Sequence, residues 1–456
     1  MSTPPNRLRP RTPQRVAPAA KRKIANARTN LSQIDLNSQF QQAIELVEHQ
    51  GESIFITGKA GTGKSTLLQY LRATTTKQTV VLAPTGVAAL NVGGQTIHSF
   101  FQFPPTLVDP QAIRRRRNTK LFQQLQTLII DEVSMVRADV MDGVDLALRM
   151  YRNTPRTPFG GVQVVLCGDL FQLPPIVRDG ALNTFFHEQY GGPYFFLAHV
   201  FAGLRPYLLE LTTIYRQQDE EFIHVLNKIR EHDLDSELFT LLNTRVRRGG
   251  DMLSDDGVIT LTTTNEAAFR KNMLCLDRLT AKSHSYAASI TGDFEPATFP
   301  TESVLELKRG AQVMLIRNDL EKRWVNGTLG KVSSLSEQKV CVEIDGVSYE
   351  VEPETWQHIR YHYNQETNRI EEEVMGTFTQ YPLRLAWAIT IHKSQGQTFD
   401  KVQIDLGRGA FAHGQTYVAL SRCRSLEGII FTRPVTARDI LFDERVYGFR
   451  QVFQTV

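Results

Sequence analysis

A glycine-rich segment near the start of the chain has the residue types and spacing of a phosphate-binding loop. Gly58-Lys-Ala-Gly-Thr-Gly-Lys64-Ser65 fits the pattern G-x-x-x-x-G-K-S/T between an apolar run at 53–57 and a helical segment at 66–72. Glycines let backbone N–H groups curl around phosphate oxygens, and the helix N-terminus adds its positive end. We expect Lys64 to reach the β- and γ-phosphates and the Ser65 hydroxyl to ligate Mg²⁺. The segment predicts nucleotide binding by Gly58, Ala60, Gly61, Thr62, Gly63, Lys64, Ser65 and Thr66.

A pair of acidic residues after another apolar run supplies the second half of this chemistry. Leu128-Ile-Ile130 predicts a buried strand, and Asp131 and Glu132 follow at its end. We predict that Asp131 holds the magnesium shell and that Glu132 polarises an attacking water. Together with the loop, the pair indicates hydrolysis of a nucleoside triphosphate. A GTPase would need N-K-x-D, and Asn227-Lys-Ile-Arg230 fails at the last position; the serine-glycine-glycine-glutamine signature of transporter ATPases is absent.

These residues come at the ends of short apolar runs that alternate with helical patterns from about residue 38 to 215. The alternation predicts a parallel sheet with helices on both faces, where ligands sit at the carboxyl ends of the strands. The runs lie at 53–57, 79–83, 128–130 and 162–167. A second set at 258–262, 312–316, 384–390 and 401–405 predicts another α/β unit. Period-two segments at 331–332, 339–344 and 347–351 predict a small antiparallel barrel inserted in that unit.

Length and composition are those of a globular chain with more than one core. The 456 residues, 41% hydrophobic and 22% charged, suggest roughly two to four domains. No run of about 18 apolar residues occurs in the sequence, so we expect no spanning helix and no membrane partner. The four cysteines are far apart and form no C-x-x-C pair, which indicates neither a zinc site nor a disulfide framework and fits a reducing compartment.

The beginning of the chain concentrates positive charge. The net charge of +4 decides little by itself, but eight arginines and lysines and five prolines precede the first acidic residue, Asp35. Low hydrophobicity and high charge predict a disordered basic tail over 1–34. Such a tail is solvated, or it adds non-specific attraction to phosphate, or it is a transit peptide; against the last, the segment is short of serine and has no clear apolar face.

Six segments, in order along the chain, resemble the motifs of the PIF family of superfamily 1 DNA helicases. The resemblance covers roughly residues 36 to 433 and implies an ATP-driven motor that walks along single-stranded DNA. The segments are Leu82–Phe101 (DNA-contacting), Asp131–Met135 (acidic), Phe159–Pro175 (family signature and third motif), Leu211–Arg216 (fourth), Ala386–Gly396 (fifth) and Tyr417–Arg422 (sixth).

The resemblance implies that the second α/β unit completes the nucleotide site from the far side of the γ-phosphate. Arg216 and Arg422 are the candidate arginine fingers, and such a residue is worth about 10³ to 10⁵ in rate. Gln172 is expected to sense the γ-phosphate or to position water. With Lys64 and the acidic pair, these three residues complete the predicted catalytic set.

Two further nucleotide contacts follow from the resemblance. Gly396, at the end of the fifth motif, is expected to lie at the nucleotide. The family also has a glutamine near the start of the motor that reads adenine. By spacing to Gly58, we assign this role to Gln41, with Gln39 and Gln42 as its neighbours, although the surrounding residues depart from the usual pattern.

DNA contacts are expected beside the nucleotide cleft. Hydroxyl, imidazole and ammonium groups suit phosphate contacts, which position DNA without reading its sequence. Phe100, with Phe101 and Phe103 nearby, is a candidate for base stacking, worth about 1 to 3 kcal/mol per base, although at least two of the three are expected in the core. The family's phosphate-contacting positions correspond to Thr85, His98, Thr390, His392, Lys393 and Ser394.

The resemblance also implies an α/β fold of two tandem RecA-like parallel-sheet domains with two insertions. The first domain is expected at 35–210 with a wedge at about 92–125. The second is expected to combine 211–322 and 379–456 around the small antiparallel β-barrel at 323–378. Arg114-Arg-Arg-Arg117, in the wedge, is a solvated charge run or a patch that faces duplex DNA at a fork.

The implied activity is ATP- and Mg²⁺-dependent unwinding of DNA from single strands and forks, with 5′-to-3′ movement given by the resemblance alone. Three alternatives stay open: a RecD-like translocase subunit of a nuclease complex, a DNA-stimulated P-loop ATPase that does not unwind, and a passive single-strand binder, which would not need an intact ATP site. A monomer on DNA fits because both halves of the ATP site lie in one chain. We expect a cytoplasmic, nucleoid-associated location in a bacterium, or a mitochondrial or nuclear one otherwise.

Overall fold

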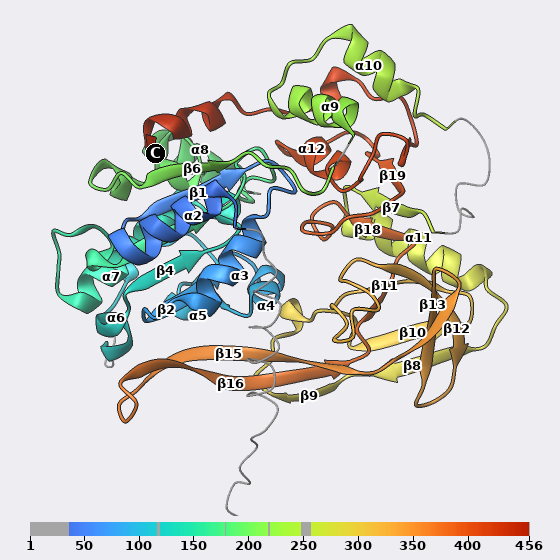
Figure 1. The fold of residues 1–456 in the computed structure, drawn as a ribbon, viewed down its shortest axis with the longest axis horizontal. Coiled ribbons are helices and arrows are strands. Elements are labelled where there is room, and N and C mark those ends of the chain that lie inside the picture. Colours follow the sequence, from blue (N-terminus) through green and yellow to red (C-terminus); the bar gives the residue numbers. More distant parts are fainter. Residues whose placement is uncertain (1–35, 116–118, 178, 218, 248–256, 456) are drawn as a thin grey trace, which may run out of the picture.

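The computed structural model describes residues 36–115, 119–177, 179–217, 219–247 and 257–455 (Figure 1). Two parallel sheets, each with its own helices, lie beside one another, and antiparallel strands run along one edge of the pair. The α/β class predicted from the sequence is therefore confirmed. The predicted tail at 1–34, and Arg116 and Arg117 of the charge run, lie outside the described residues.

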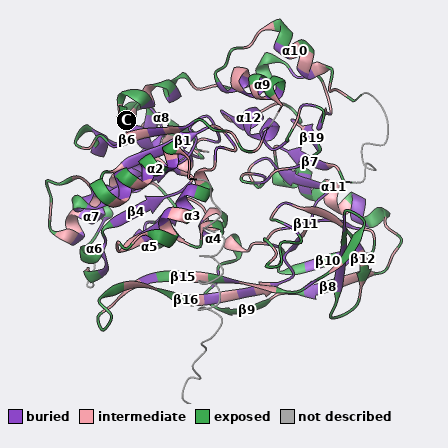
Figure 2. Cartoon of the chain, viewed as in Figure 1, coloured by how far each residue is buried: buried purple, intermediate pink, exposed green. Residues whose placement is uncertain are grey.

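The first sheet carries the phosphate-binding loop and is parallel throughout. Its central strands are buried along their whole length, as expected for a sheet covered on both faces (Figure 2). Ile54 of β1 pairs with Val165 on one side and Tyr207 on the other. In sheet order the strands are β21 (Gln454–Thr455), β6 (Tyr207–Leu211), β1 (Ile54–Gly58), β5 (Gln163–Cys167), β4 (Thr127–Ile130), β2 (Thr79–Ala83) and β3 (Gln95–Thr96).

Helices cover both faces of this sheet, and side-chain caps start several of them. The Thr85 and Thr96 hydroxyls accept hydrogen bonds from the first turns of α4 and α5, which satisfies donors that have no partner inside a helix. The helices are α2 (Ser38–Ile44), the π-helix η1 (Glu45–Gln50), α3 (Lys64–Thr74), α4 (Gly86–Val92), α5 (Ile97–Phe101), α6 (Lys120–Gln124), α7 (Ala138–Arg152) and α8 (Gly180–Tyr190). The predicted wedge therefore holds α5 and α6, and its action on a duplex stays a prediction.

The second parallel sheet positions the opposite wall of the nucleotide site. Its strands, in sheet order, are β18 (Ala388–Thr390), β7 (Ile259–Thr262), β19 (Val402–Asp405) and β20 (Ile429–Phe431). Its helices are α9 (Glu220–Arg230), α10 (Ser236–Asn243), α11 (Asn265–Arg278) and α12 (Gln415–Leu420). Every residue of α12 is buried, which fixes the chain between the two units.

Antiparallel strands occupy residues 283–385, a wider range than the predicted 323–378. They form three sheets, so a closed barrel stays a prediction. The five-stranded sheet contains β14 (Val347–Val351), β13 (Val340–Ile344), β12 (Leu329–Leu335), β11 (Gln312–Leu315) and β17 (Leu383–Leu385). The other two sheets pair β10 (Val304–Lys308) with β8 (Ser283–Ala287), and β15 (Glu354–Asn364) with β16 (Arg369–Gln380) and β9 (Ser289–Gly292).

Two strands predicted for the second parallel sheet are placed differently. Residues 312–315 form β11 of the antiparallel sheet, and the run at 384–390 splits into β17 and β18, which belong to different sheets. The Gln312 side chain donates to Val258 O at 2.9 Å and Ala386 O at 2.8 Å, which ties the two sheets together where the chain crosses. An apolar run does not reveal which sheet it joins.

The C-terminal residues return to the first sheet, so the predicted inclusion of all of 379–456 in the second domain is wrong. Gln454 and Thr455 pair with β6. The rings of Phe449 and Phe453 lie 6.0 and 5.0 Å from the ring of Phe55 on β1. Burial of these two rings on β1 explains why the end of the chain leaves the second unit.

The long hairpin of β15 and β16 extends from the antiparallel strands beneath the first unit (Figure 1). Glu372 forms a 2.8 Å ion pair with Arg72 of α3, and the backbone N–H of Ile370 donates to the Gln78 side chain at 2.8 Å. The Tyr361 hydroxyl lies 3.5 Å from Val81 N of β2. The hairpin therefore contacts the first unit directly.

Replacing Phe453 with alanine should destabilise the first unit, because the ring is 4% exposed and fills space between Phe55, Phe195 and Phe201. We expect a loss of about 3 to 5 kcal/mol, measured as a shift of urea-induced unfolding. Phe411→Ala serves as the control because that ring is 60% exposed, and it should change stability by less than about 0.5 kcal/mol. Equal effects of the two substitutions would contradict the assigned core.

Candidate active site

The phosphate-binding loop is folded so that its glycines meet close neighbours. Gly61 and Gly63 both have φ of +84°, in the region that favours glycine. A Cβ on Gly61 would lie 2.5 Å from the Cβ of Arg216, so the loop can meet the second wall of the site only with glycine there. Lys64 Nζ donates to Gly58 O at 2.7 Å and Lys59 O at 2.9 Å, and burial lowers its pKa. The two carbonyls thus hold the ammonium in place, and a phosphate bound beside it would favour its charged form.

The acidic pair lies at the end of β4, beside the loop. Asp131 is 9% exposed, and its Oδ1 accepts from the N–H of Glu132 at 2.9 Å. Glu132 has a left-handed backbone (φ 51°), a strained conformation for a residue with a side chain. Burial, and then the charge of Asp131, raises the pKa of Glu132 to about 7. A carboxylate with this pKa is suited to accept a proton near neutral pH.

The donors beside the loop suit magnesium bound together with a nucleotide. Ser65 lines the cleft, and Asp131 lies behind it. In the described parts of the chain, no group of three or more His, Cys, Asp or Glu residues could hold a metal ion by itself. Mg²⁺ commonly uses one or two protein oxygens, with waters and substrate phosphates as its other ligands. A hydroxyl and a carboxylate therefore fit the predicted role.

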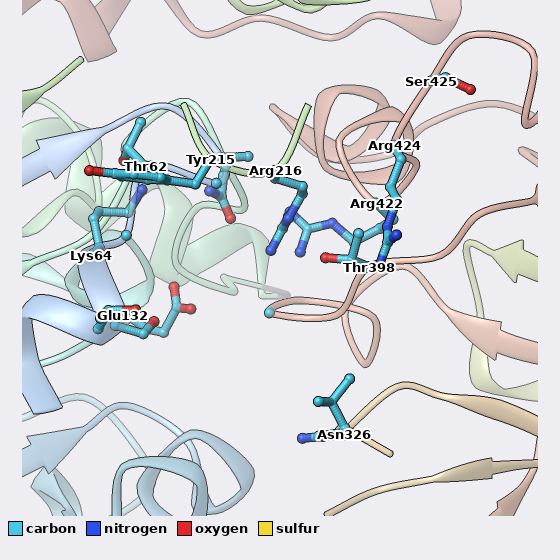
Figure 3. A pocket seen from close by; sticks show the side chains of 18 of the residues that line it. Thr62, Lys64, Glu132, Tyr215, Arg216, Asn326, Thr398, Arg422, Arg424 and Ser425 are labelled. Atoms are coloured by element: carbon cyan, nitrogen blue, oxygen red, sulfur yellow. The ribbon is translucent and has the colours of Figure 1, made fainter. Parts of the chain in front are cut away.

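Two arginines of separate segments face the loop from the opposite wall (Figure 3). Arg216 follows β6 and donates to Ser421 O at 3.2 Å; burial lowers its pKa. Arg422 is 2% exposed and donates to Val418 O at 3.0 Å and Ser421 Oγ at 2.8 Å. Burial, and then the charge of Arg216, lowers the pKa of Arg422 to about 9. Two buried like charges favour entry of an anion between them and Lys64.

These groups surround one cleft of about 1060 Å³. Five of the six predicted catalytic residues line it, with Asp131 directly behind, and so does predicted Gly396. Gly58 ends β1 beneath the loop and is not part of the lining. Eight of the lining residues are not predicted from the sequence, and only two of them, Tyr215 and Phe40, adjoin predicted positions. The eight are Phe40, Tyr215, Asp219, Val325, Asn326, Thr398, Arg424 and Ser425.

The assignment of Gln41 to the nucleotide is wrong in this structure. Its side chain is exposed and donates back to Leu36 O at 3.0 Å. Phe40, the preceding residue on α2, lines the cleft instead, since adjacent helical residues point about 100° apart. Gln39 is also engaged elsewhere, because its amide donates to Glu210 O at 2.7 Å and accepts from Thr212 N at 3.0 Å.

Three predicted DNA contacts are contradicted by burial. Phe100 is 4% exposed, with its ring 4.9 Å from that of Phe101, so it belongs to the core and cannot stack on a base here. Thr390 is 4% exposed, and its hydroxyl accepts from Lys393 N. Ser394 is completely buried and donates to Ile391 O. The two hydroxyls shape the loop after β18 instead of facing a ligand.

The remaining predicted DNA contacts are accessible. Thr85 and His98 are partly exposed on the loop and helix that follow β2 and β3, and Lys393 is exposed after β18. His392 is partly exposed, and its ring lies parallel to that of Phe411 at 6.2 Å. Burial lowers the pKa of both His98 and Lys393. These groups come from both parallel units, so a ligand that reached all of them would span the two.

Comparison with known proteins identifies relatives along most of the chain. The model of the PIF1-like helicase family matches residues 33–238, and the 2B domain of the DNA helicase Pif1 matches 296–335. A mouse protein named ATP-dependent DNA helicase PIF1 is 36% identical, covering 86% of this chain and 59% of the mouse protein. A Bdellovibrio bacteriovorus protein named ATP-dependent DNA helicase Pif1 is 31% identical, covering 92% and 93% of the two chains. The chain thus spans 59% and 60% of the mouse and human relatives.

Solved structures from the same group share the fold. Unliganded Pif1 from a Bacteroides species matches with a TM-score of 0.83 and 38% identity, covering 92% of this chain and 97% of that one. Bacteroides Pif1 bound to single-stranded DNA matches with a TM-score of 0.65 and 39% identity over the same shares. Bacteroides Pif1 in complex with ADP-AlF4 matches with a TM-score of 0.84, so the present arrangement is nearer these two structures than the one bound to single-stranded DNA. Because the Bdellovibrio and Bacteroides proteins are matched over almost their full length at more than 30% identity, this chain belongs to the PIF1-like helicase family.

Proposed function

We propose that this chain is an ATP-dependent DNA helicase that moves along single-stranded DNA in the 5′-to-3′ direction. The observation that carries the proposal is the cleft in which Lys64 and Glu132 of the first parallel unit face Arg422 of the second. Arg216 joins them there from the segment between β6 and α9, which connects the two units. A nucleotide between two units of one chain can change their relative position, and that change is what a motor needs. The direction is inferred from family resemblance alone.

The names of the relatives support the substrate class. The mouse and human proteins are named ATP-dependent DNA helicases. The Bacteroides structures include a complex with ADP-AlF4 and one with single-stranded DNA. Another matching structure is described as the basis for DNA unwinding at forked double-stranded DNA by two coordinating Pif1 helicases. For the present chain we propose the same ligands: ATP, single-stranded DNA and forks. We also propose that one chain suffices for each ATP site.

Hydrolysis would use the cleft residues in distinct roles. Lys64 and the loop N–H groups bind the phosphates, and Glu132 accepts the proton of the attacking water. Ser65 and Asp131 would hold Mg²⁺, which neutralises charge that develops between the β- and γ-phosphates. Gln172 lines the cleft, and its Nε2 donates to Asp169 Oδ2 at 3.1 Å, which holds the side-chain amide in one orientation.

Movement would follow from the arginines, because Arg422 follows α12 of the second unit and Arg216, in the segment that connects the two units, donates to Ser421 O of that unit. Contacts of Arg216 and Arg422 with the γ-phosphate favour a closed cleft, and hydrolysis removes those contacts. Thr85 and His98 of the first unit, and His392 and Lys393 near the second sheet, would then shift relative to one another along the strand. Alternating grip by the two groups produces directional stepping.

The remaining expectations concern the membrane and the location in the cell. No helix of the described residues is long and apolar enough to cross a membrane. We propose action at the nucleoid in a bacterial cell, or at mitochondrial or nuclear DNA otherwise. A RecD-like translocase that needs a partner is the second candidate, because the same cleft would serve it.

Glu132→Gln should abolish turnover without abolishing nucleotide binding. The amide keeps the shape of the side chain but cannot accept the water's proton, so kcat for DNA-stimulated ATP hydrolysis should fall by about 10² to 10⁴. Fluorescent ATP titration should show little change in affinity. Glu188→Gln, at an exposed position on α8, is the matched control and should leave both quantities unchanged. A wild-type kcat in Glu132→Gln would remove this residue from the catalytic set.

Strand separation from tailed duplexes tests the helicase itself. Wild type with ATP and Mg²⁺ should unwind a duplex with a 5′ tail and not one with a 3′ tail, and Lys64→Ala should unwind neither because the phosphate contact is lost. Unwinding of only the 3′-tailed substrate would reverse the proposed direction. DNA-stimulated hydrolysis without any unwinding would instead favour the RecD-like translocase.

A further inference from the structure

A buried polar cluster behind Gln172 connects the two parallel units outside the cleft. Asp169, on the loop after β5, is 1% exposed, and Arg230, the last residue of α9, is 4% exposed. Arg230 Nη2 lies 3.5 Å from Asp169 Oδ1 and 3.8 Å from Glu210 Oε1. Neither Asp169 nor Arg230 lines the nucleotide cleft.

Besides Asp169 and Glu210, few groups among the described residues can interact with the Arg230 guanidinium. Its guanidinium lies 3.9 Å from the centre of the Phe171 ring, a cation–π distance. Its Nε has no hydrogen-bond partner among the described residues. The adjoining cavity, about 10 Å³, is at the limit of what one water needs. Burial opposes the charge of Arg230, but its surroundings, with Asp169 first, outweigh burial and raise the pKa of the guanidinium.

Asp169 shares its carboxylate between Arg230 and the cleft. One oxygen faces Arg230, and the other accepts from Gln172 Nε2 at 3.1 Å. Asp169 Oδ1 also lies 3.2 Å from Phe171 N, so the same side chain shapes the loop. Any shift of Arg230 therefore changes the support of a residue that lines the nucleotide site.

Residues of the second unit enclose this loop from the other side. A Cβ on Gly414, the residue before α12, would lie 2.4 Å from Phe171 O and 2.5 Å from Gln172 O, so the backbones touch. The His413 ring nitrogen Nε2 lies 3.1 Å from Leu170 O. The loop is thus held in contact with α9 and α12 at once.

The cluster reaches the phosphate-binding loop as well. Tyr417, on α12, is 3% exposed, and its hydroxyl accepts from Ala60 N at 3.1 Å. The charges of Asp169 and Arg230 both act on Tyr417, which places the three groups in one electrostatic environment. The second unit therefore touches the first at two supports of the nucleotide site, the Gln172 loop and Ala60.

We propose that Arg230 is a positioning residue that couples the second unit to Gln172 through Asp169, so that turnover of bound ATP depends on the relative placement of the two units. This inference rests on the proposed function. Arg230 does not touch the nucleotide, so it acts on the rate through the geometry of Gln172 and not through binding. Loss of the guanidinium leaves a buried carboxylate without its counter-charge, and Asp169 then no longer holds Gln172 in place.

Arg230→Met tests the proposal by separating rate from binding. We expect kcat for ATP hydrolysis with single-stranded DNA to fall between about tenfold and 100-fold, as small misplacements near a reacting group do. KM for ATP should change little, and the ratio of rates with and without DNA should fall. Arg230→Lys, which keeps the charge but not the planar fork, should recover part of the rate.

Arg152→Met is the matched control for a merely structural arginine. Arg152 ends α7 and donates to backbone carbonyls of Phe122, Leu125 and Gly160, away from the cleft. Arg152→Met should lower the thermal unfolding midpoint and leave kcat for ATP hydrolysis unchanged. If Arg230→Met behaves in the same way, with a lower midpoint and a wild-type kcat, the proposal is overturned.

Two further comparisons keep the result decisive. If Arg230→Met does not fold, Arg230→Lys and Asp169→Asn carry the test: a lowered kcat supports the proposal, and wild-type rates in both overturn it. Wild type, measured in parallel, shows whether a negative result concerns the proposed function or only the role of Arg230. Absence of DNA stimulation in wild type would overturn the proposed function and this inference with it, whereas unaffected variants beside an active wild type would overturn the inference alone.

Discussion

Two arginines held together in a buried cleft are the constraint on which the rest of this structure depends. Arg216 and Arg422 repel one another, and burial disfavours both charges. Carbonyl and hydroxyl oxygens of the second unit hold them in place, and an anion between them and Lys64 relieves the remaining cost. The chain between β6 and α12, and both parallel sheets, are arranged so that this one anion site is completed across two units.

This arrangement links occupancy of the ATP cleft to the relative position of the two units without a further structural element. Because Lys64 belongs to the first unit and Arg422 to the second, whatever occupies the cleft sets how the two units sit relative to one another. The buried contact between Asp169 and Arg230 works in the other direction, since it ties the support of Gln172 to the position of α9. The same two units carry the accessible groups for which we propose DNA contacts. Occupancy of one site and grip at another are therefore parts of one equilibrium.

What the sequence predicted well is local, and what it missed depends on tertiary contacts. The phosphate-binding loop and Asp131 follow strands directly, so spacing alone located them. Gln41 was assigned by counting along the chain, whereas the angle around α2 places Phe40 at the cleft. The run at 312–316 was apolar enough for either sheet. Arg230 gave no signal, because its partner Asp169 lies 61 residues away and the two meet only when the units pack.

If one chain completes its own ATP site, two variants that are inactive on opposite sides of the cleft cannot restore hydrolysis when they are mixed. Lys64→Ala removes the cation of the phosphate-binding loop, and Arg422→Ala removes the charge of the opposite wall. We expect the mixture, with single-stranded DNA present, to hydrolyse ATP no faster than the separate variants at any ratio, under conditions in which wild type is active. Recovery of hydrolysis in the mixture would show that Arg422 of one chain reaches Lys64 of another, and the ATP site would then not be completed within one chain.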